Sequence, residues 1–363
     1  MTHDNDMVVV VNAAQEGAQA PLGGIQKAIL GQLAALRSRG LQICLLSAAY
    51  RCAERARDMG CEVHFDPRWH HVLAPLVVPS LLKRVVSLRR RHPAAVIHHS
   101  GRPWVWTHLL FPRSANLVVM HREIPRPYRF FRRWLALSPD YATALESDPR
   151  TGDRRVAWAP NCLTQEPGIP RQREARQPGA ITLGFAGRVG DGKGLDVLFR
   201  AIGELRAKGL NVALKLAGPK DPWVAMAARQ HGIERAVEEM GWQEEIARFF
   251  DGIDCLVLPS EKESFGMVLI EAMAAGLPVV ATACNGPRSI IVDGTTGSIV
   301  PIGDTRGLAT AIERLATSPD LAESMGHAGY RRALEFYTPT TSANRLLEGL
   351  TSLGGSFSGR GRR

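Results

Sequence analysis

Residues 259–276 read PSEKESFGMVLIEAMAAG and form the most informative pattern in the chain. The apolar residues 255–258 come directly before them and are typical of a buried strand that ends at Pro259. The residues after Gly266 are mostly helix formers, and Gly276 is a helix stop signal. The sequence therefore predicts a strand, a short polar loop and a helix.

Two carboxylates, Glu263 and Glu271, lie on either side of the start of this helix. The first turn of a helix has unpaired backbone N–H groups and the positive end of the helix dipole, so it attracts anions such as a diphosphate. The two carboxylates would repel phosphate but can accept hydrogen bonds from sugar hydroxyls. Together these groups suit a nucleotide sugar.

A second glycine-rich loop, GRVGDGKG at residues 187–194, follows a predicted strand at 180–186 and precedes a predicted helix at 195–208. Arg188 and Lys193 project two cations from this loop, which could neutralise a diphosphate. The order of residues differs from that of a Walker phosphate loop. Loops at the carboxyl ends of parallel strands share one crevice, so both loops are expected at the same site.

The length of 363 residues and the 45% hydrophobic content indicate two ordinary globular domains. No apolar run approaches the roughly 18 residues of a membrane-spanning helix. The acidic first residues do not resemble a signal peptide, and six cysteines without a CxxC pair indicate reduced thiols. A cytoplasmic protein is therefore expected.

A strand–helix–strand pattern begins at residues 7–12 and starts again at 180–186, which predicts two doubly wound parallel sheets. Gly23 and Gly24 open the first helix (25–39) and would allow a ligand close to the backbone. The predicted divisions are a first domain (1–163), a linker (164–179), a second domain (180–335) and, after a further segment, a disordered basic tail (354–363).

The net charge of +10 comes from the first part of the chain. Residues 1–155 contain 22 Lys and Arg against 12 Asp and Glu, and residues 67–139 contain 13 against one. This excess indicates an anionic partner, such as a membrane surface or a phosphorylated acceptor. The residues expected to make this contact are Lys83 and Arg84 on a predicted helix (80–92), and Arg126, Arg129, Arg132 and Arg133 among aromatic residues. The alternatives are a solvated protein surface and, less favoured, a nucleic acid.

Residues 263–282 resemble the Glu-x7-Glu signature of the retaining GT-B glycosyltransferases of family 4. The loop with Arg188 and Lys193 is similar to a second signature of that family, and Gly23-Gly24 resembles its N-terminal glycine loop. The resemblance extends over essentially the whole chain. It implies that the first domain binds the acceptor, that the second domain binds the nucleotide sugar, and that a terminal helix (336–353) crosses back to the first domain. It implies an α/β protein with the GT-B fold, in which two Rossmann-like domains face each other across a cleft.

The resemblance also implies roles for single residues. Glu263 would contact the donor sugar, Glu271 the ribose hydroxyls, Arg188 and Lys193 the diphosphate, and His121 the region of the donor sugar. The other residues expected near the donor are Gly23, Gly24, Gly187, Gly218, Trp242, Ser264, Phe265, Gly266, Met267 and Val268. The paired histidines, His70-His71 and His98-His99, are interpreted as ordinary structural residues.

The expected activity is transfer of a hexose, with retention, from a UDP- or GDP-sugar to a glycan or lipid-linked acceptor such as a lipopolysaccharide or exopolysaccharide precursor. The family is usually metal-independent, so neither a metal nor a cofactor is expected, and nucleic acid is not an expected partner. The protein is expected in the cytoplasm, with peripheral binding to the inner face of the cell membrane. Residues 285–287 (NGP) predict a turn. Residues 285–289 (NGPRS) depart from the family pattern and leave the donor open. The alternatives are a catalytically silent GT-B binding protein and a GT-B sugar phosphorylase.

Overall fold

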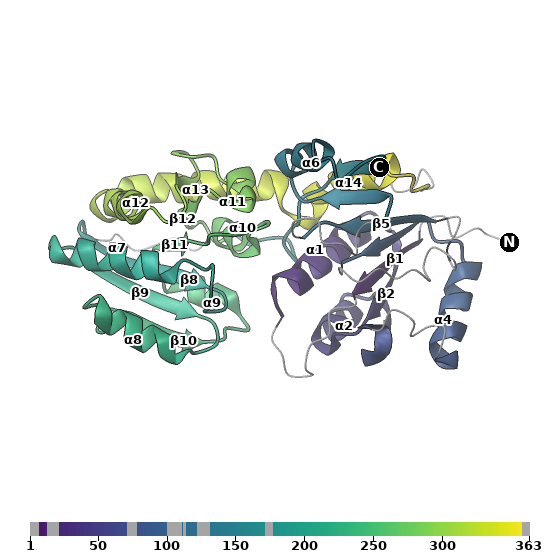
Figure 1. The fold of residues 1–363 in the computed structure, drawn as a ribbon, viewed down its shortest axis with the longest axis horizontal. Coiled ribbons are helices and arrows are strands. Elements are labelled where there is room, and N and C mark those ends of the chain that lie inside the picture. Colours follow the sequence, from purple (N-terminus) through teal and green to yellow (C-terminus); the bar gives the residue numbers. More distant parts are fainter. Residues whose placement is uncertain are drawn as a thin grey trace. The chain divides into compact units, whose positions relative to one another are not determined.

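The computed structural model describes residues 7–12, 22–70, 78–99, 111, 114–121, 131–170 and 177–357. The chain forms two compact units (Figure 1). Unit 1 consists of Met1–Glu166 and Phe336–Arg363, and unit 2 consists of Pro167–Glu335. Each unit is built on a parallel β-sheet, as the repeated strand–helix pattern predicts.

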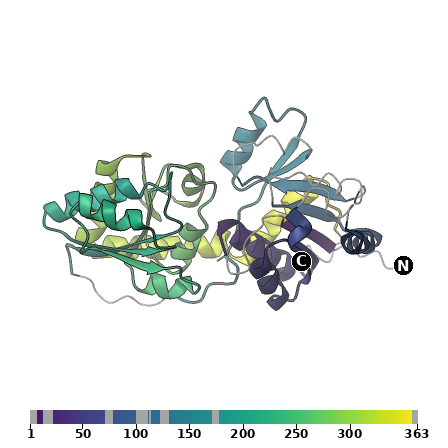
Figure 2. The same ribbon diagram turned by 60° about the horizontal axis from the view of Figure 1, so that its bottom comes forward.

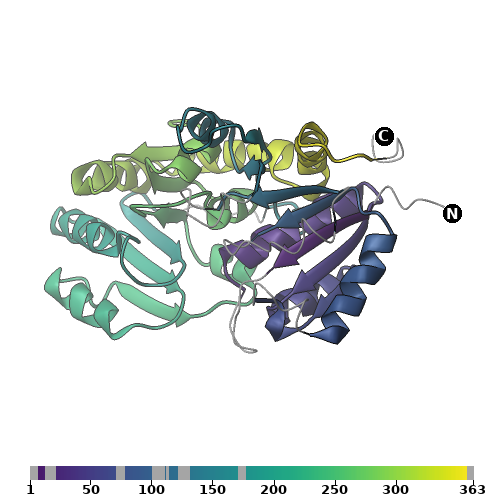
Figure 3. The ribbon, with the colours of Figure 1, turned by 45° about the vertical axis from the view of Figure 1, so that its right-hand side comes forward.

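The sheet of unit 1 has the order β3-β2-β1-β4-β5-β6-β7, and all of its pairings are parallel (Figure 3). The described strands are β1 (Met7–Asn12), β2 (Gln42–Ser47), β3 (Glu62–Phe65), β4 (Ala95–His98), β5 (Ala115–Val119), β6 (Arg133–Ala136) and β7 (Arg155–Trp158). Central strands β1 and β4 are buried along their whole length, which explains their continuous apolar sequences.

The helices of unit 1 bury apolar faces against this sheet. They are α1 (Gly24–Ser38), α2 (Tyr50–Asp58), the short 3₁₀ helix η1 (Pro67–His70), α4 (Pro79–Arg90), α6 (Pro139–Glu146) and α14 (Pro339–Ser352). Leu81, Val85 and Leu88 of α4 join the core formed by alternate residues of β1 and β2, whereas Lys83 and Arg84 of the same helix are exposed. The helix predicted over 80–92 is thus amphipathic, with a basic outer face.

The sheet of unit 2 has the order β10-β9-β8-β11-β12-β13 and is also parallel throughout its paired strands (Figures 1 and 2). Its strands are β8 (Ala180–Ala186), β9 (Asn211–Ala217), β10 (Val237–Gly241), β11 (Cys255–Leu258), β12 (Val279–Thr282) and β13 (Gly297–Val300). Its helices are α7 (Leu195–Ala207), α8 (Pro222–Gln230), α9 (Ile246–Asp251), α10 (Met267–Ala274), α11 (Asn285–Ile290), α12 (Thr305–Thr317) and α13 (Pro319–Phe336).

Both sheets have a topological switch point, where the chain returns to the middle of the sheet and continues in the other direction. In unit 2 the switch lies between β8 and β11, and in unit 1 it lies between β1 and β4. The carboxyl ends of the two strands at a switch open a crevice in which ligands bind in open α/β sheets. In unit 2, the loops 187–194 and 259–266 follow these two strands.

Helix α14 belongs to unit 1 although it comes last in the chain, and it packs beside α1 and against β7. Arg345 lies over the ring of Trp158, 4.3 Å from its centroid. The predicted disordered tail begins at residue 354, but the Gly355 amide donates to the Leu350 carbonyl at 2.8 Å. Residues 354–357 therefore continue from the helix, and 358–363 lie outside the described residues.

The structure corrects the prediction of a turn at residues 285–287, which instead begin helix α11. Cys284 has extended backbone angles just before the helix, and Pro287 lies in the first turn, where its missing N–H costs little. Within the described residues, no helix is both long and apolar enough to cross a membrane.

Candidate functional site

The two loops at the switch point of unit 2 both end in a glycine with left-handed backbone angles. Gly194 (φ +67°) comes immediately before α7, and Gly266 (φ +97°) comes immediately before α10. Glycine adopts this conformation at little cost, and no side chain at either position covers the first turn of the helix. The first backbone amides of both helices are thus presented at one edge of the sheet, where an anion would bind.

The two loops contact each other directly. A Cβ atom at Gly194 would lie 1.9 Å from the Pro259 carbonyl oxygen, so only glycine allows this approach. The Glu261 amide donates to the Gly192 carbonyl at 2.9 Å. Across the same junction, Lys193 Nζ lies 3.2 Å from Glu263 Oε2, and both side chains are partly buried. Two residues predicted to bind different parts of one ligand thus form an ion pair.

The end of β12 supports the loop that carries Glu263. The Ser260 carbonyl accepts hydrogen bonds from Thr282 Oγ1 and from the Cys284 thiol. Burial raises the pKa of Cys284, so its thiol remains a donor at neutral pH. The Gly286 amide donates to the Glu263 carbonyl at 3.0 Å. The sequence prediction missed these supports, although β12 follows β11 in a parallel sheet and must end at the same edge.

Most of the other residues predicted at the donor site also lie at this edge. Glu271 lies half-buried in the second turn of α10, and Arg188 is exposed in the loop after β8. Ser264 is half-buried, whereas Phe265 and Met267 are 4% and 8% exposed. The side chains of Phe265 and Met267 therefore belong to the core of unit 2, and their contribution to a ligand site is limited mainly to the backbone.

Gly218 and Trp242 follow β9 and β10, the two strands beyond β8. A Cβ atom at Gly218 would lie 2.0 Å from the Gly187 carbonyl oxygen. Gly218 is therefore needed for the contact between two loops, whether or not a ligand is bound. Trp242 is half-buried directly after β10 and lies at the same edge of the sheet. Val268 is half-buried in the first turn of α10.

His121 lies in unit 1, two residues after the end of β5, and is 7% exposed. Its Nε2 atom lies 3.0 Å from Nδ1 of His99, and Nε2 of His99 lies 3.0 Å from Oε1 of Gln32. Burial lowers the pKa of His99 well below its usual value of 6.5, and His121 and His98 lower it further. The interpretation of His99 as an ordinary structural residue overlooked this connection to His121.

The other predicted residues of unit 1 differ in their surroundings. Gly23 caps α1 and Gly24 is its first residue, and a Cβ atom at Gly24 would have none of the described residues within 4 Å. The described residues therefore do not require glycine at this position. Arg132 is exposed and lies 4.0 Å from Asp153, while Arg133 is half-buried at the start of β6. Arg126 and Arg129 lie outside the described residues.

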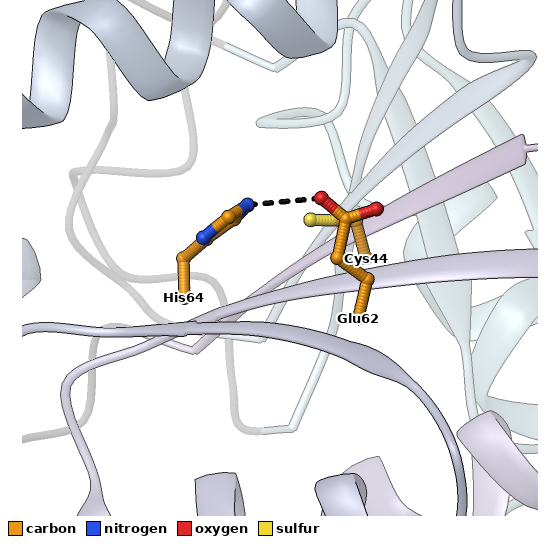
Figure 4. Close-up of side chains that lie close together, drawn as sticks. All are labelled: Cys44, Glu62 and His64. Atoms are coloured by element: carbon orange, nitrogen blue, oxygen red, sulfur yellow. Dashed lines mark hydrogen bonds and ion pairs between the residues drawn. The ribbon is translucent and has the colours of Figure 1, made fainter.

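Cys44, Glu62 and His64 form a cluster with potential metal ligands on β2 and β3 (Figure 4). Their surroundings explain the cluster without a metal. Glu62 pairs with His64 Nε2 at 3.0 Å and with Arg91 Nη1 at 2.5 Å. Burial raises the pKa of Cys44 and keeps its thiol protonated, whereas a metal ligand must be a thiolate. Burial opposes the charged form of Glu62, but Arg91 and His64 outweigh it and lower the pKa of this carboxyl.

Comparisons with known proteins place this geometry in a family. The family model for glycosyl transferases group 1 matches residues 180–318, which include both loops of the switch point. The D-inositol 3-phosphate glycosyltransferase of Actinosynnema mirum is 34% identical over 363 residues, which cover 89% of this chain and 81% of that protein. The chain belongs to the group 1 glycosyl transferases. The enzyme of the same name from Streptomyces coelicolor is 32% identical to this glycosyltransferase, over 47% of this chain and 42% of that protein.

Solved structures show that the glycosyltransferase has the GT-B fold. Anabaena HepE in complex with UDP and glucose has a TM-score of 0.73 at 17% identity, covering 95% of this chain and 99% of that one. The lipopolysaccharide outer core galactosyltransferase WaaB has a TM-score of 0.68 at 16% identity, with coverages of 95% and 99%. The prediction of two Rossmann-like domains with the GT-B fold is confirmed.

Proposed function

We propose that this glycosyltransferase transfers a hexose, with retention of the anomeric configuration, from a UDP- or GDP-sugar to a glycan or lipid-linked acceptor. The observation that carries the proposal is the ion pair between Lys193 and Glu263 at the switch point of unit 2. It brings together a cation for a diphosphate and a carboxylate for sugar hydroxyls, beside two helix N-termini. UDP is bound by HepE, which has the same fold.

Each part of this site would bind a different chemical group of the donor. The β-phosphate becomes more negative as its bond to the sugar breaks, and Lys193, Arg188 and the first amides of α10 would stabilise that charge. Glu263 would release Lys193 to the diphosphate and accept hydrogen bonds from hexose hydroxyls. Glu271, farther along α10, would accept hydrogen bonds from the ribose.

The proposed reaction draws its positive charge from Arg188 and Lys193 and needs no divalent cation. The acceptor oxygen would attack the sugar on the face from which the nucleoside diphosphate leaves. The departing phosphate would take the proton of the acceptor hydroxyl, which balances the charge. Turnover that is unchanged by a chelator would support this assignment, whereas restoration of lost turnover by Mg²⁺ or Mn²⁺ would contradict it.

The acceptor is proposed to bind unit 1, which carries the positive charge. Unit 1 has 26 Lys and Arg against 14 Asp and Glu, whereas unit 2 has 19 against 21. A lipid-linked acceptor would be reached by peripheral binding at the inner face of the cell membrane. D-inositol 3-phosphate is a second candidate acceptor, because curated relatives act on it by name and because it is an anion.

Sugar transfer by the Lys193→Ala and Glu263→Gln variants tests the proposal. Loss of one group that stabilises the leaving phosphate typically lowers turnover by about 10² to 10³, and we expect a decrease of this size for Lys193→Ala. Lys262→Ala and Glu261→Gln are matched controls, since both side chains are exposed in the same loop. Wild-type rates in both test variants would show that Lys193 and Glu263 have no role in sugar transfer. Turnover that requires free phosphate would instead indicate a sugar phosphorylase.

A further inference from the structure

A chain of three polar side chains connects three elements of unit 1. Gln32 lies on α1, His99 follows β4 and His121 follows β5. The three residues are 1%, 2% and 7% exposed. Strands β4 and β5 are parallel neighbours, so the two histidines leave the sheet at the same edge, and β4 borders the switch point of unit 1. These polar groups are therefore buried at the ligand-binding edge of their sheet.

The hydrogen bonds in this chain determine which nitrogen atoms carry protons. An amide oxygen can only accept, so Nε2 of His99 must donate its proton to Gln32 Oε1 at 3.0 Å. His99 is neutral, because burial lowers its pKa. Its Nδ1 atom is then an acceptor, and Nε2 of His121 must donate to it at 3.0 Å. In its neutral form, His121 thus keeps its proton on Nε2.

We propose that His99 is a positioning residue that, together with Gln32, holds His121 in its Nε2–H tautomer and makes Nδ1 its basic nitrogen. This inference rests on the proposed function, together with the place near the donor sugar that the family resemblance implies for His121. A basic Nδ1 atom accepts a hydrogen bond from a sugar hydroxyl and does not donate one. Gln32 and His99 therefore determine whether Nδ1 of His121 accepts a hydrogen bond from the substrate or donates one.

The adjacent histidine provides a contrast within the same strand. His98 is the last residue of β4 and is fully buried, but its ring packs against Phe131 with centroids 4.8 Å apart. Successive side chains of a strand point to opposite faces, which separates His98 from the connection between His99 and His121. His98→Leu is therefore a matched control for the loss of a buried imidazole in β4.

Nitrogen chemical shifts of ¹⁵N-histidine-labelled protein measure the tautomers directly and do not depend on enzymatic activity. We expect protonated Nε2 and unprotonated Nδ1 for both His99 and His121 in the wild type. Gln32→Met removes the acceptor at similar size and should produce a mixture of tautomers at His99 and His121, whereas His98→Leu should leave them unchanged. A wild-type His121 protonated on Nδ1 would overturn the proposal, because it requires the Gln32 amide to donate.

Kinetics of sugar transfer provide the second measurement. Loss of a group that orients a functional histidine commonly costs about 10-fold to 100-fold, so kcat should fall by this factor in Gln32→Met while KM for the donor stays near the wild-type value. His99→Asn offers an amide in place of the imidazole and should recover part of the kcat lost in His99→Leu. Equal kcat values in Gln32→Met and wild type would overturn the positioning role. Absence of transfer by the wild type would refute the proposed function. The tautomer measurement would still show which nitrogen atoms of His99 and His121 donate hydrogen bonds.

Discussion

Gly192 and Gly194 lie in one loop and both have positive φ, but only one of them is in close contact. Among the described residues, a Cβ atom at Gly192 (φ +76°) would have no neighbour within 4 Å, whereas one at Gly194 would collide with the Pro259 carbonyl oxygen. The Gly192→Ala variant thus measures the cost of the backbone conformation. Gly194→Ala adds the cost of separating the two loops that carry Lys193 and Glu263.

We predict that Gly192→Ala lowers the free energy of unfolding of unit 2 by about 1 kcal/mol, the usual cost of a left-handed non-glycine residue. Gly194→Ala should cost at least about 2 kcal/mol more, since overpacking against fixed backbone adds to that term. Denaturant unfolding measures both values, and isothermal titration with UDP should show weaker binding only for Gly194→Ala. Equal stabilities of the two variants would contradict the contact with Pro259.

An acid-sensitive contact lies at the start of α7. His231 Nε2 lies 3.1 Å from Asp196 Oδ1, and Arg200 Nη2 lies 2.6 Å from Asp196 Oδ2. The hydrogen bond with His231 lowers the pKa of Asp196 below its usual value of 3.8, and Arg200 lowers it further. A carboxyl with a lowered pKa in the folded state contributes stability above the unfolded pKa. That contribution disappears as the pH falls through the folded pKa.

Asp196→Asn should therefore reduce the stability of unit 2 at pH 7 by less than about 1 kcal/mol, as is typical of exposed ion pairs. The difference from the wild type should begin to decrease near the unfolded pKa of about 3.8 and should vanish only below the lowered folded pKa, where Asp196 is protonated in both states. Urea unfolding between pH 2 and pH 7 measures this trend, and Asp251→Asn, an exposed carboxylate in the same unit, is the control. A difference that does not decrease between pH 7 and pH 2 would assign the effect to something other than the charge of Asp196.

At the residue scale, the sequence pattern indicates candidate ligand groups but not the residues that support them. Glu263 and Lys193 stand out because charged residues in glycine-rich loops after buried strands have few structural roles. Their mutual ion pair depends on the distance between β8 and β11, which are far apart in sequence. Cys284 and Gln32 have no local pattern that distinguishes them from ordinary buried residues. Their roles arise only from neighbours in the folded chain.

At the element scale, strands were predicted most accurately because a buried parallel strand is a short apolar run between polar loops. The predicted bounds of β1, β8 and β11 agree with the structure. Helix α11 was mistaken for a turn because asparagine, glycine and proline at residues 285–287 favour turns when read alone. Helix α13 was not predicted, since Gly326 and Gly329 interrupt its sequence. Gly326 packs so closely on the Gly276 backbone that only glycine fits.

Helix α14 shows how an element can belong to a distant part of the chain. Its residues Leu346 and Leu350 are 2% and 0% exposed, and the helix packs on α1 and β7 of unit 1. The prediction of a terminal helix at 336–353 came from the family resemblance. The sequence pattern indicates an amphipathic helix but not the surface that covers it.

We predict that Leu350→Ala lowers the stability of unit 1 by about 2–5 kcal/mol, the usual cost of removing a buried leucine side chain. Thr351→Ala is the control, because Thr351 is exposed on the same helix. Hydrogen exchange followed by peptide mass spectrometry should show faster exchange in β1 and β7 and unchanged exchange in β8 and β11. Faster exchange confined to unit 2 would contradict the placement of α14 in unit 1.

At the scale of the whole molecule, the two units differ in formal net charge. Unit 1 has a formal net charge of +12 and unit 2 of −2, from their counts of 26 and 19 basic residues against 14 and 21 acidic ones. The loops that suit a nucleotide sugar lie in the unit without excess charge. Attraction to an anionic surface would thus act through unit 1.

The exposed basic face of α4 provides the test of this division. Each Lys or Arg near an anionic bilayer contributes about 1 kcal/mol, so Lys83→Ser/Arg84→Ser should weaken binding to phosphatidylglycerol vesicles about 30-fold at low salt. Arg229→Ser/Arg235→Ser removes the same charge from exposed positions of unit 2 and should change binding little. Binding should also decrease with added salt and be absent with phosphatidylcholine vesicles, because the attraction is electrostatic. If both double variants lose the same amount of vesicle affinity, the binding depends on net charge and not on the basic face of α4. Tight binding of duplex DNA with no vesicle binding would favour a nucleic-acid partner for this face.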